Sequence, residues 1–167
     1  RALRGSPLMA YAIENASESG VIDEVFVSTD SRDYAEIARE HGAWVPYLRP
    51  AKLATDEASA IDTYVHTLRT LSEEFDREFD HFVVLQPTSP LRRASHVREV
   101  RRKLTSREAV RAMVSVCPME HPLEWVNTLP EDRNMEGFLD SGVDRANRQE
   151  HETYFRLNGA IYAADVD

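Results

Sequence analysis

The chain has 167 residues and a formal net charge of −9, with 42% hydrophobic and 29% charged residues. This size and composition are typical of one soluble globular domain and exclude global disorder. The acidic balance and the short apolar runs lead us to expect neither a nucleic-acid partner nor a membrane partner. The single cysteine, Cys117, excludes an internal disulfide and fits a reducing, cytoplasmic location.

Helices and strands are predicted to alternate along the chain. Ser6 and Pro7 are expected to begin the first helix as N-cap and first helical residue, and Gly20 is expected to end it. Ser31 is expected to begin the second helix. The predicted strands are 21–29, 43–45, 81–85, 112–117 and 154–163, and the predicted helices are 7–19, 31–41, 59–75 and 95–104.

This alternation with short links predicts an α/β fold with a mostly parallel sheet. The run 81–85 lacks apolar–polar alternation, so we expect a central strand that is covered on both faces. From 118 to 153 the rhythm breaks, and the stretch is too long for a plain loop. Its apolar residues favour a dimerisation arm that meets a second copy of the chain, with a surface flap on its own domain as the alternative.

Polar clusters follow three of the predicted strands, and ligands of open α/β sheets bind beyond such strand ends. The clusters are residues 28–30, the loop that carries Arg49, Thr55, Asp56 and Ser59, and the segment Gln86-Pro87-Thr88-Ser89-Pro90-Leu91-Arg92. Neutral donors and acceptors beside Arg92 suit a polar, oxygen-rich, anionic ligand. Neither a proteolytic triad nor zinc-binding spacing is present.

Purely structural roles compete with ligand binding at several of these residues. Asp30, Asp56 and Ser59 each stand where a helix cap is expected, and Arg49 could form a structural ion pair. Gln86, at the end of a buried strand, is better explained by function. The pair Asp165 and Asp167 is only a weak metal signal, because no third ligand accompanies it.

Several strings resemble, in order and spacing, the N-acylneuraminate (sialic acid) cytidylyltransferases. They are "PLMAYAIENA", "VFVSTDS", "LRPAKLATDEASAIDT", "VVLQPTSPLR" and "RLNGAIYAADVD". The resemblance covers nearly the whole chain and is weakest between Pro118 and Arg145. Cytidylyltransferases for the eight-carbon keto-sugar acid carry an acidic residue where this chain has Thr88, which favours the nine-carbon branch.

The resemblance implies a Rossmann-like nucleotidyltransferase with a small dimerisation excursion, acting as a homodimer with Mg²⁺. The implied reaction joins CMP from CTP to a nine-carbon keto-sugar acid and releases pyrophosphate, with the anomeric hydroxyl attacking the α-phosphorus. Catalysis then rests on alignment and on stabilisation of phosphate charge. The implied catalytic residues are Gln86, Arg92 and Arg156; the nucleotide-binding residues are Arg49, Asp56, Ser59 and Thr88; and the sugar-binding residues are Gln86, Ser89, Arg92, Arg148 and Tyr162. Arg148 and Tyr162 match positions that reach the sugar site of the dimer partner.

Two family features fall outside the chain as given. The glycine- and lysine-rich phosphate loop is expected before Arg1, and the aspartates that hold Mg²⁺ are expected after Asp167. We therefore expect 1–167 to be a single cytidylyltransferase domain, truncated at both ends, with no metal ligand of its own. The same chemistry on pseudaminic or legionaminic acid, a non-catalytic nucleotide- or sugar-binding module, and a nucleotide-fold domain of unrelated function are the alternatives.

Overall fold

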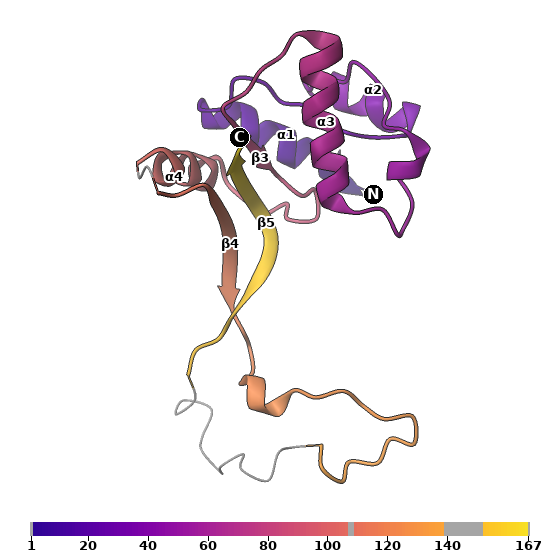
Figure 1. Ribbon diagram of the computed structural model, residues 1–167, viewed down its shortest axis with the longest axis vertical. Coiled ribbons are helices and arrows are strands. Elements are labelled where there is room, and N and C mark those ends of the chain that lie inside the picture. Colours follow the sequence, from indigo (N-terminus) through magenta and orange to yellow (C-terminus); the bar gives the residue numbers. More distant parts are fainter. Residues whose placement is uncertain (1, 107–108, 139–151, 167) are drawn as a thin grey trace. The chain divides into compact units, whose positions relative to one another are not determined.

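The computed structural model describes residues 2–106, 109–138 and 152–166, which form two compact units (Figure 1). The first unit comprises Arg1–Val114 and Gly159–Asp167, and the second comprises Ser115–Asn158. The helices are α1 (Leu8–Ser19), α2 (Arg32–Glu40), α3 (Ala60–Phe75) and α4 (Ala94–Thr105). The strands are β1 (Ala2–Leu3), β2 (Ser6–Pro7), β3 (His81–Val84), β4 (Ala112–Pro118) and β5 (Phe155–Asp165), with short 3-10 helices at Ala51–Leu53 and Leu123–Trp125. Interleaved helices and strands confirm the predicted α/β class.

The four helices lie where the sequence predicts them, but their caps differ in part. Pro7 is the N-cap of α1 and no side chain caps the helix, because Ser6 is paired in the β1–β2 ladder; the expected Ser6 cap is wrong. Gly20 ends α1 in the left-handed conformation, as predicted. Ser31 caps α2 by accepting the backbone N–H of Tyr34. None of the helices in the described part of the chain has the length and apolar composition that a membrane crossing requires.

The predicted strand 21–29 is present only as a single parallel bridge between Phe26 and Trp44. Trp44 donates to the carbonyl of Val25 at 2.8 Å and accepts from Val27 at 3.2 Å, so the segments 21–29 and 43–45 do run side by side. The side chains around this bridge form the core of the first unit. That core comprises Ile13, Ala35, Ala38, Ala43 and Val45, with Met9, Val25 and Val27 packed against it.

The strands β3, β5 and β4 form a sheet in that order (Figure 1). β3 pairs with β5 in the antiparallel direction, with His81 opposite Asp165 and Val84 opposite Tyr162. The prediction that 81–85 is a central strand is wrong: β3 stands at the end of this sheet, and β5 stands between it and β4. The cause is pairing with a strand about 80 positions later, which the local sequence pattern does not report.

Helix α3 turns only part of its predicted apolar stripe inward. Leu71 is buried, whereas Ile61 is 69% exposed and Val65 is also exposed. Helix α4 packs against α1. The guanidinium of Arg98 on α4 donates to the carbonyls of Glu18 and Ser19 at the end of α1, at 3.3 and 3.5 Å. Cations at a helix C-terminus stabilise it, so this contact joins the two helices.

The second unit contains the ends of β4 and β5 and the stretch that was expected to be an excursion. Ser115 donates its hydroxyl to Asn158 at 2.6 Å, and Met119 donates its N–H to the carbonyl of Tyr154 at 2.8 Å. Beyond this ladder the described chain is a short 3-10 helix and irregular turns. The residues 139–151 lie outside the described part.

Candidate functional site

The segment after β3 is a pair of tight turns. The carbonyl of Gln86 accepts the N–H of Ser89, and the carbonyl of Ser89 accepts the N–H of Arg92, both at 3.2 Å. Each turn has a proline as its second residue, where the fixed φ of proline is favourable. The segment is therefore stiff, and it presents Thr88 to solvent while Gln86 and Ser89 are half-buried.

Arg92 closes these turns from inside the protein. Its side chain is 6% exposed, and Nη1 donates to the carbonyl of Gln86 at 3.2 Å and to the carbonyl of Ala160 at 2.6 Å. Burial lowers the pKa of the guanidinium, because desolvation disfavours the charged form. The sequence predicted a cation that faces a ligand; in the structure, one nitrogen of that cation binds the protein backbone.

A pocket of about 280 Å³ lies in the loop that the sequence singled out for the nucleotide. Its lining residues come from the 49–58 loop and the start of α3. They are Arg49, Leu53, Ala54, Thr55, Ala58, Ala60, Thr63 and Tyr64. The mixture of apolar wall and few polar groups is typical of a small-molecule site.

Arg49 is the cation of this pocket, and both of the roles considered from sequence are compatible with its position. Its N–H donates to the carbonyl of Thr29 at 2.8 Å, and its Nη2 lies 3.8 Å from Oδ1 of Asp30. Its Nε is buried and has no hydrogen-bond partner among the described residues. Asp30 does not cap α2, since Ser31 does.

Asp56 and Ser59 do not line the pocket. The hydroxyl of Ser59 accepts the backbone N–H of Asp62 at 3.4 Å and caps α3, which is the structural role considered for it. The cap considered for Asp56 is therefore wrong, because Ser59 occupies the N-cap position; the Asp56 side chain is exposed. Their nucleotide-binding roles stay predictions.

Tyr64 is the residue that the sequence reasoning missed, since it was assigned only to the interior stripe of a helix. It lines the pocket, and its ring centroid lies 6.2 Å from that of Phe82 on β3. Burial raises the pKa of its phenol, and the nearby Tyr162 raises it further. Tyr64 thus lines the predicted nucleotide pocket and interacts electrostatically with Tyr162 on β5. A phenol among threonines on one helical face was the available signal.

The remaining predicted residues are on β5 and in the second unit. Tyr162 is half-buried opposite Val84. Arg156 is exposed and belongs to the second unit. Arg148 lies outside the described residues. The structure therefore brings together Gln86, Arg92 and β5, and separately Arg49 and Tyr64, and tests no relation of Arg156 or Arg148 to either group.

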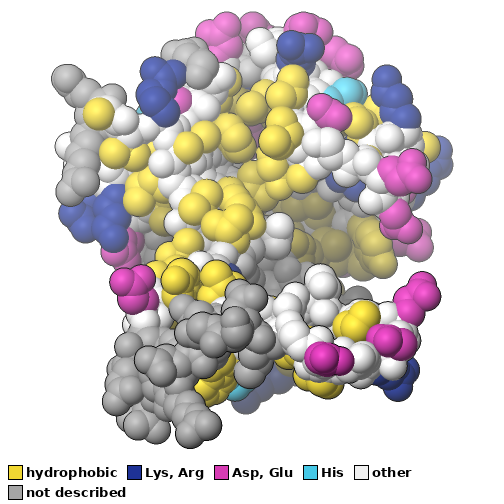
Figure 2. All heavy atoms as spheres, turned by 60° about the horizontal axis from the view of Figure 1, so that its bottom comes forward, with side chains coloured by type: hydrophobic (Ala, Val, Ile, Leu, Met, Phe, Trp, Pro, Cys, Tyr) yellow, Lys and Arg dark blue, Asp and Glu magenta, His cyan; other side chains and the backbone are white. Residues whose placement is uncertain are grey.

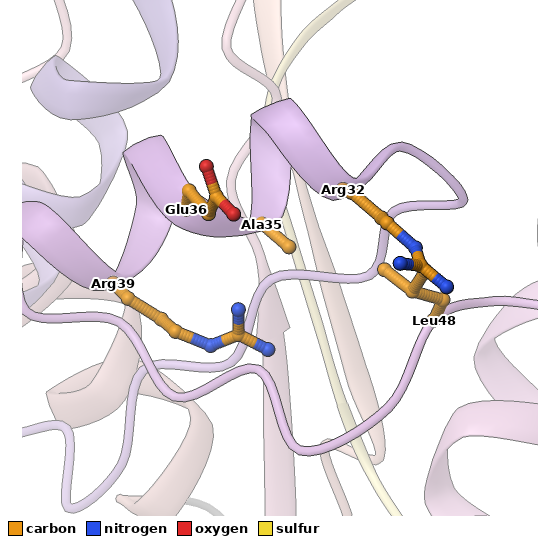
Figure 3. Close-up of a pocket in the computed structure, with 5 residues that line it drawn as sticks. All are labelled: Arg32, Ala35, Glu36, Arg39 and Leu48. Carbon is orange, nitrogen blue, oxygen red and sulfur yellow. The ribbon is translucent and has the colours of Figure 1, made fainter.

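A second pocket, of about 270 Å³, lies beside α2 and contains none of the predicted residues (Figure 3). Arg32, Glu36 and Arg39 project from α2, and Leu48, in a later loop, lies beside Arg32. Arg39 already donates to the carbonyl of Val45. We assign the candidate site to the Arg49 pocket, where an unpartnered nitrogen and the predicted loop coincide.

Metal ligands were expected outside the chain. No group of three or more His, Cys, Asp or Glu side chains in the described residues could hold a metal ion. Asp165 is engaged otherwise: its carboxylate lies 2.8 Å from Nε of Arg111 and 3.4 Å from Nε2 of His81. Asp167 is not among the described residues. The described part of the chain therefore does not fit a Mg²⁺ site.

Comparison with known proteins places these features in one family. Residues 1–164 match the family described as cytidylyltransferase. The chain is 35% identical over 159 residues to the N-acylneuraminate cytidylyltransferase of Escherichia coli O18:K1:H7, an alignment that covers 95% of this chain and 36% of that protein. It is 34% identical to the CMP-N,N'-diacetyllegionaminic acid synthase of Legionella pneumophila, covering 98% of this chain and 69% of that protein.

A pseudaminic acid cytidylyltransferase of Campylobacter jejuni is 27% identical, over 95% of this chain and 67% of its own length. The solved structure of a CMP:2-keto-3-deoxy-manno-octonic acid synthetase, complexed with CTP, shares the fold, with a TM-score of 0.65 and 19% identity. That match covers 99% of this chain and 66% of the solved one. The family match extends over almost every residue, so the chain belongs to the cytidylyltransferases; it spans 36% of the length of the Escherichia coli relative.

Proposed function

We propose that the protein transfers CMP from CTP to a nine-carbon keto-sugar acid of the sialic acid type. The anomeric oxygen of the sugar forms a bond to the α-phosphorus, the bond from that phosphorus to the β-phosphate oxygen breaks, and pyrophosphate leaves. The hydroxyl proton passes to solvent. The observation that carries the proposal is the family match over residues 1–164, together with 35% identity to an N-acylneuraminate cytidylyltransferase.

The Arg49 pocket is our proposed cytidine site. Arg49 and Thr55 supply charge and hydrogen-bonding capacity, while Leu53, Ala54 and Tyr64 supply an apolar wall. The phenol of Tyr64 is protonated at neutral pH and can donate a hydrogen bond, and burial raises its pKa further above the usual 10.0. Asp56, Ser59 and Thr88 are proposed to complete the site from the surrounding loops.

The turns from Gln86 to Arg92 are our proposed sugar site. A primary amide such as Gln86 both donates and accepts, which suits a ligand with hydroxyl and carboxylate groups. Gln86 and Ser89 then bind the sugar acid and orient its hydroxyl toward the phosphate. Arg92 supports them through its two carbonyl contacts, and Arg156 is proposed to approach the phosphates.

Mg²⁺ is the proposed cofactor and would neutralise charge on the triphosphate. Since the described residues do not fit a metal site, we derive no step through it. Cytoplasmic location is likewise proposed, on the lone cysteine, which is free in the described chain.

A homodimer is the proposed assembly. Large apolar side chains of the second unit are exposed. In the view of Figure 2, hydrophobic side chains gather mainly in the middle and upper part of the face that is shown. Exposed apolar clusters of this kind mark interaction surfaces. The exposed residues are Val116, Leu123, Trp125, Val126, Leu129, Met135, Phe155 and Leu157. In the proposed dimer, 118–153 forms the arm, and Arg148 and Tyr162 reach the sugar site of the partner subunit.

The test is pyrophosphate release by the full-length protein from CTP, measured against N-acetylneuraminate, legionaminate, pseudaminate and the eight-carbon keto-sugar acid. We expect turnover with a nine-carbon acid, and preference for CTP over ATP and UTP, because unsatisfied groups penalise the wrong base. The second candidate function is the same reaction on legionaminic acid, which the 34% identity to the Legionella protein favours. Legionaminate as the best substrate would select this candidate. Nucleotide binding without turnover on any acid would indicate a non-catalytic module.

A further inference from the structure

Gly159 stands on β5 against the side chain of Gln86. Its φ is +71°, and a Cβ built on it would lie 2.6 Å from Oε1 and 3.4 Å from Cδ of Gln86. Real Cβ atoms do not approach another heavy atom this closely, so the amide of Gln86 occupies space that only glycine leaves open. Glycine is also the residue that adopts this backbone conformation without strain.

The backbone around this contact is held from both strands. β3 and β5 pair with Val84 opposite Tyr162, and continuing this register brings Gln86 opposite Ala160, next to Gly159. There the carbonyls of Gln86 and Ala160 both accept from Nη1 of Arg92. The buried guanidinium of Arg92 therefore joins the two backbone segments just past the last paired residues of β3.

We propose that Gly159 is a positioning residue that seats the Gln86 amide for the sugar acid, with Arg92 holding the two backbones together. This inference rests on the proposed function. The atom that a Cβ would displace is the far end of a flexible side chain, so the clash is relieved by moving the Gln86 amide. The substitution should therefore lower catalysis with the sugar acid much more than it lowers the stability of the fold.

The chain offers a matched control in Gly20. Its φ is +65°, almost that of Gly159, but a Cβ there meets nothing within 4 Å. Gly20→Ala therefore also places a side chain at a positive φ, but it displaces no other side chain. We expect Gly159→Ala and Gly20→Ala to lower the denaturant midpoint by similar amounts.

The kinetic readouts separate the two variants. We expect Gly159→Ala to lower kcat/KM for the sugar acid by about tenfold to a hundredfold, since small misplacements of aligned groups cost this much. The KM for CTP should stay unchanged, and Gly20→Ala should match the unmodified protein in both parameters. In a Gln86→Ala background, Gly159→Ala should cause no further kinetic loss. An equal loss in both backgrounds would overturn the inference.

One readout is independent of turnover. The side-chain amide signal of Gln86 in an ¹⁵N correlation spectrum, assigned by its loss in Gln86→Ala, should shift in Gly159→Ala and stay in place in Gly20→Ala. An unchanged Gln86 signal in Gly159→Ala would refute the proposal that Gly159 positions the Gln86 amide. If the unmodified protein turned over no sugar acid, the proposed function would fail, and this spectrum would still decide whether Gly159 positions Gln86.

Discussion

The two compact units differ in how they use apolar side chains. Except for Pro122, the buried aliphatic side chains in the described part of the chain belong to the first unit, from Ala10 to Ala163. In the second unit most of the large apolar residues are exposed; Leu129, for example, is 56% exposed, whereas Met119 and Phe138 are half-buried. A unit with its own core is stabilised within one chain, whereas an exposed apolar surface is stabilised by covering it. The proposed site therefore lies in the first unit, and the surface of the proposed dimer lies in the second.

The largest effect is expected from the buried cation of the first unit. Arg92→Ala removes the donor that serves two carbonyls, so the free energy of unfolding should fall by about 3 kcal/mol, as charged hydrogen bonds of this kind are worth. Chemical denaturation of the full-length protein measures this. Arg69→Ala, an exposed arginine on α3, is the control and should change stability little. Equal stability in both variants would mean that the carbonyl contacts do not hold the turns.

The partner surface of the second unit is tested by charge. Val126→Asp combined with Leu129→Asp should weaken dimerisation by at least about a hundredfold, because each apolar side chain contributes about 1.5–3 kcal/mol when buried. Sedimentation at micromolar protein measures the mass. Ile61→Asp alters an even more exposed residue of the first unit and should leave the mass unchanged.

A monomeric unmodified protein would contradict the proposed role of 118–153 as a dimerisation arm.

Active sites that are shared between subunits are tested by mixing variants. A mixture of Arg148→Ala and Gln86→Ala subunits should recover part of the activity, because one site in a mixed dimer then keeps both residues. Full independence of the subunits would give no recovery.

The pocket of the first unit is tested at Tyr64. Tyr64→Phe should raise the KM for CTP by about threefold to tenfold, the equivalent of one lost neutral hydrogen bond. Tyr34→Phe, on the exposed face of α2, is the matched control and should not change it. An unchanged KM in Tyr64→Phe would move the nucleotide away from this pocket.

We also expect the stability difference between the unmodified protein and Tyr64→Phe to depend on pH. The pKa of Tyr64 is raised above its usual 10.0 in the folded protein, so the protonated phenol favours the fold. This contribution is complete below pH 10 and is lost as the pH rises through the folded-state pKa. The stability difference between the unmodified protein and Tyr64→Phe should therefore be constant at lower pH and shrink above this value. A difference that grows with alkaline pH would contradict the buried, neutral phenol.

The smallest effect is expected at Asp165. Its partner Arg111 is largely exposed, so Asp165→Asn should lower stability by at most about 1 kcal/mol. The dependence of activity on Mg²⁺ concentration should not change. A large loss of Mg²⁺ affinity would make Asp165 a metal ligand and overturn its assignment as an ion-pair residue.

The amino-acid sequence determined most of the local structure. Helix positions, the Ser31 and Gly20 caps and the strands at 81–84, 112–118 and 155–165 follow from residue preferences over a few positions. The resemblance carried by the quoted strings identified the cytidylyltransferase family and the loops to inspect. Gln86 and Arg49 became candidate site residues in this way, since polar residues after predicted strands point to a ligand-binding edge.

Only the tertiary structure decided what these side chains touch. The antiparallel partner of β3, the inward turn of Arg92 and the contact of Gly159 with Gln86 each join residues about 70 to 80 positions apart. Local preferences report how a segment folds, but they carry no information on which distant carbonyl a guanidinium will reach. For the same reason Tyr64, Ile61 and Val65 looked alike as a helical stripe, and packing made the first a pocket wall and left the other two exposed.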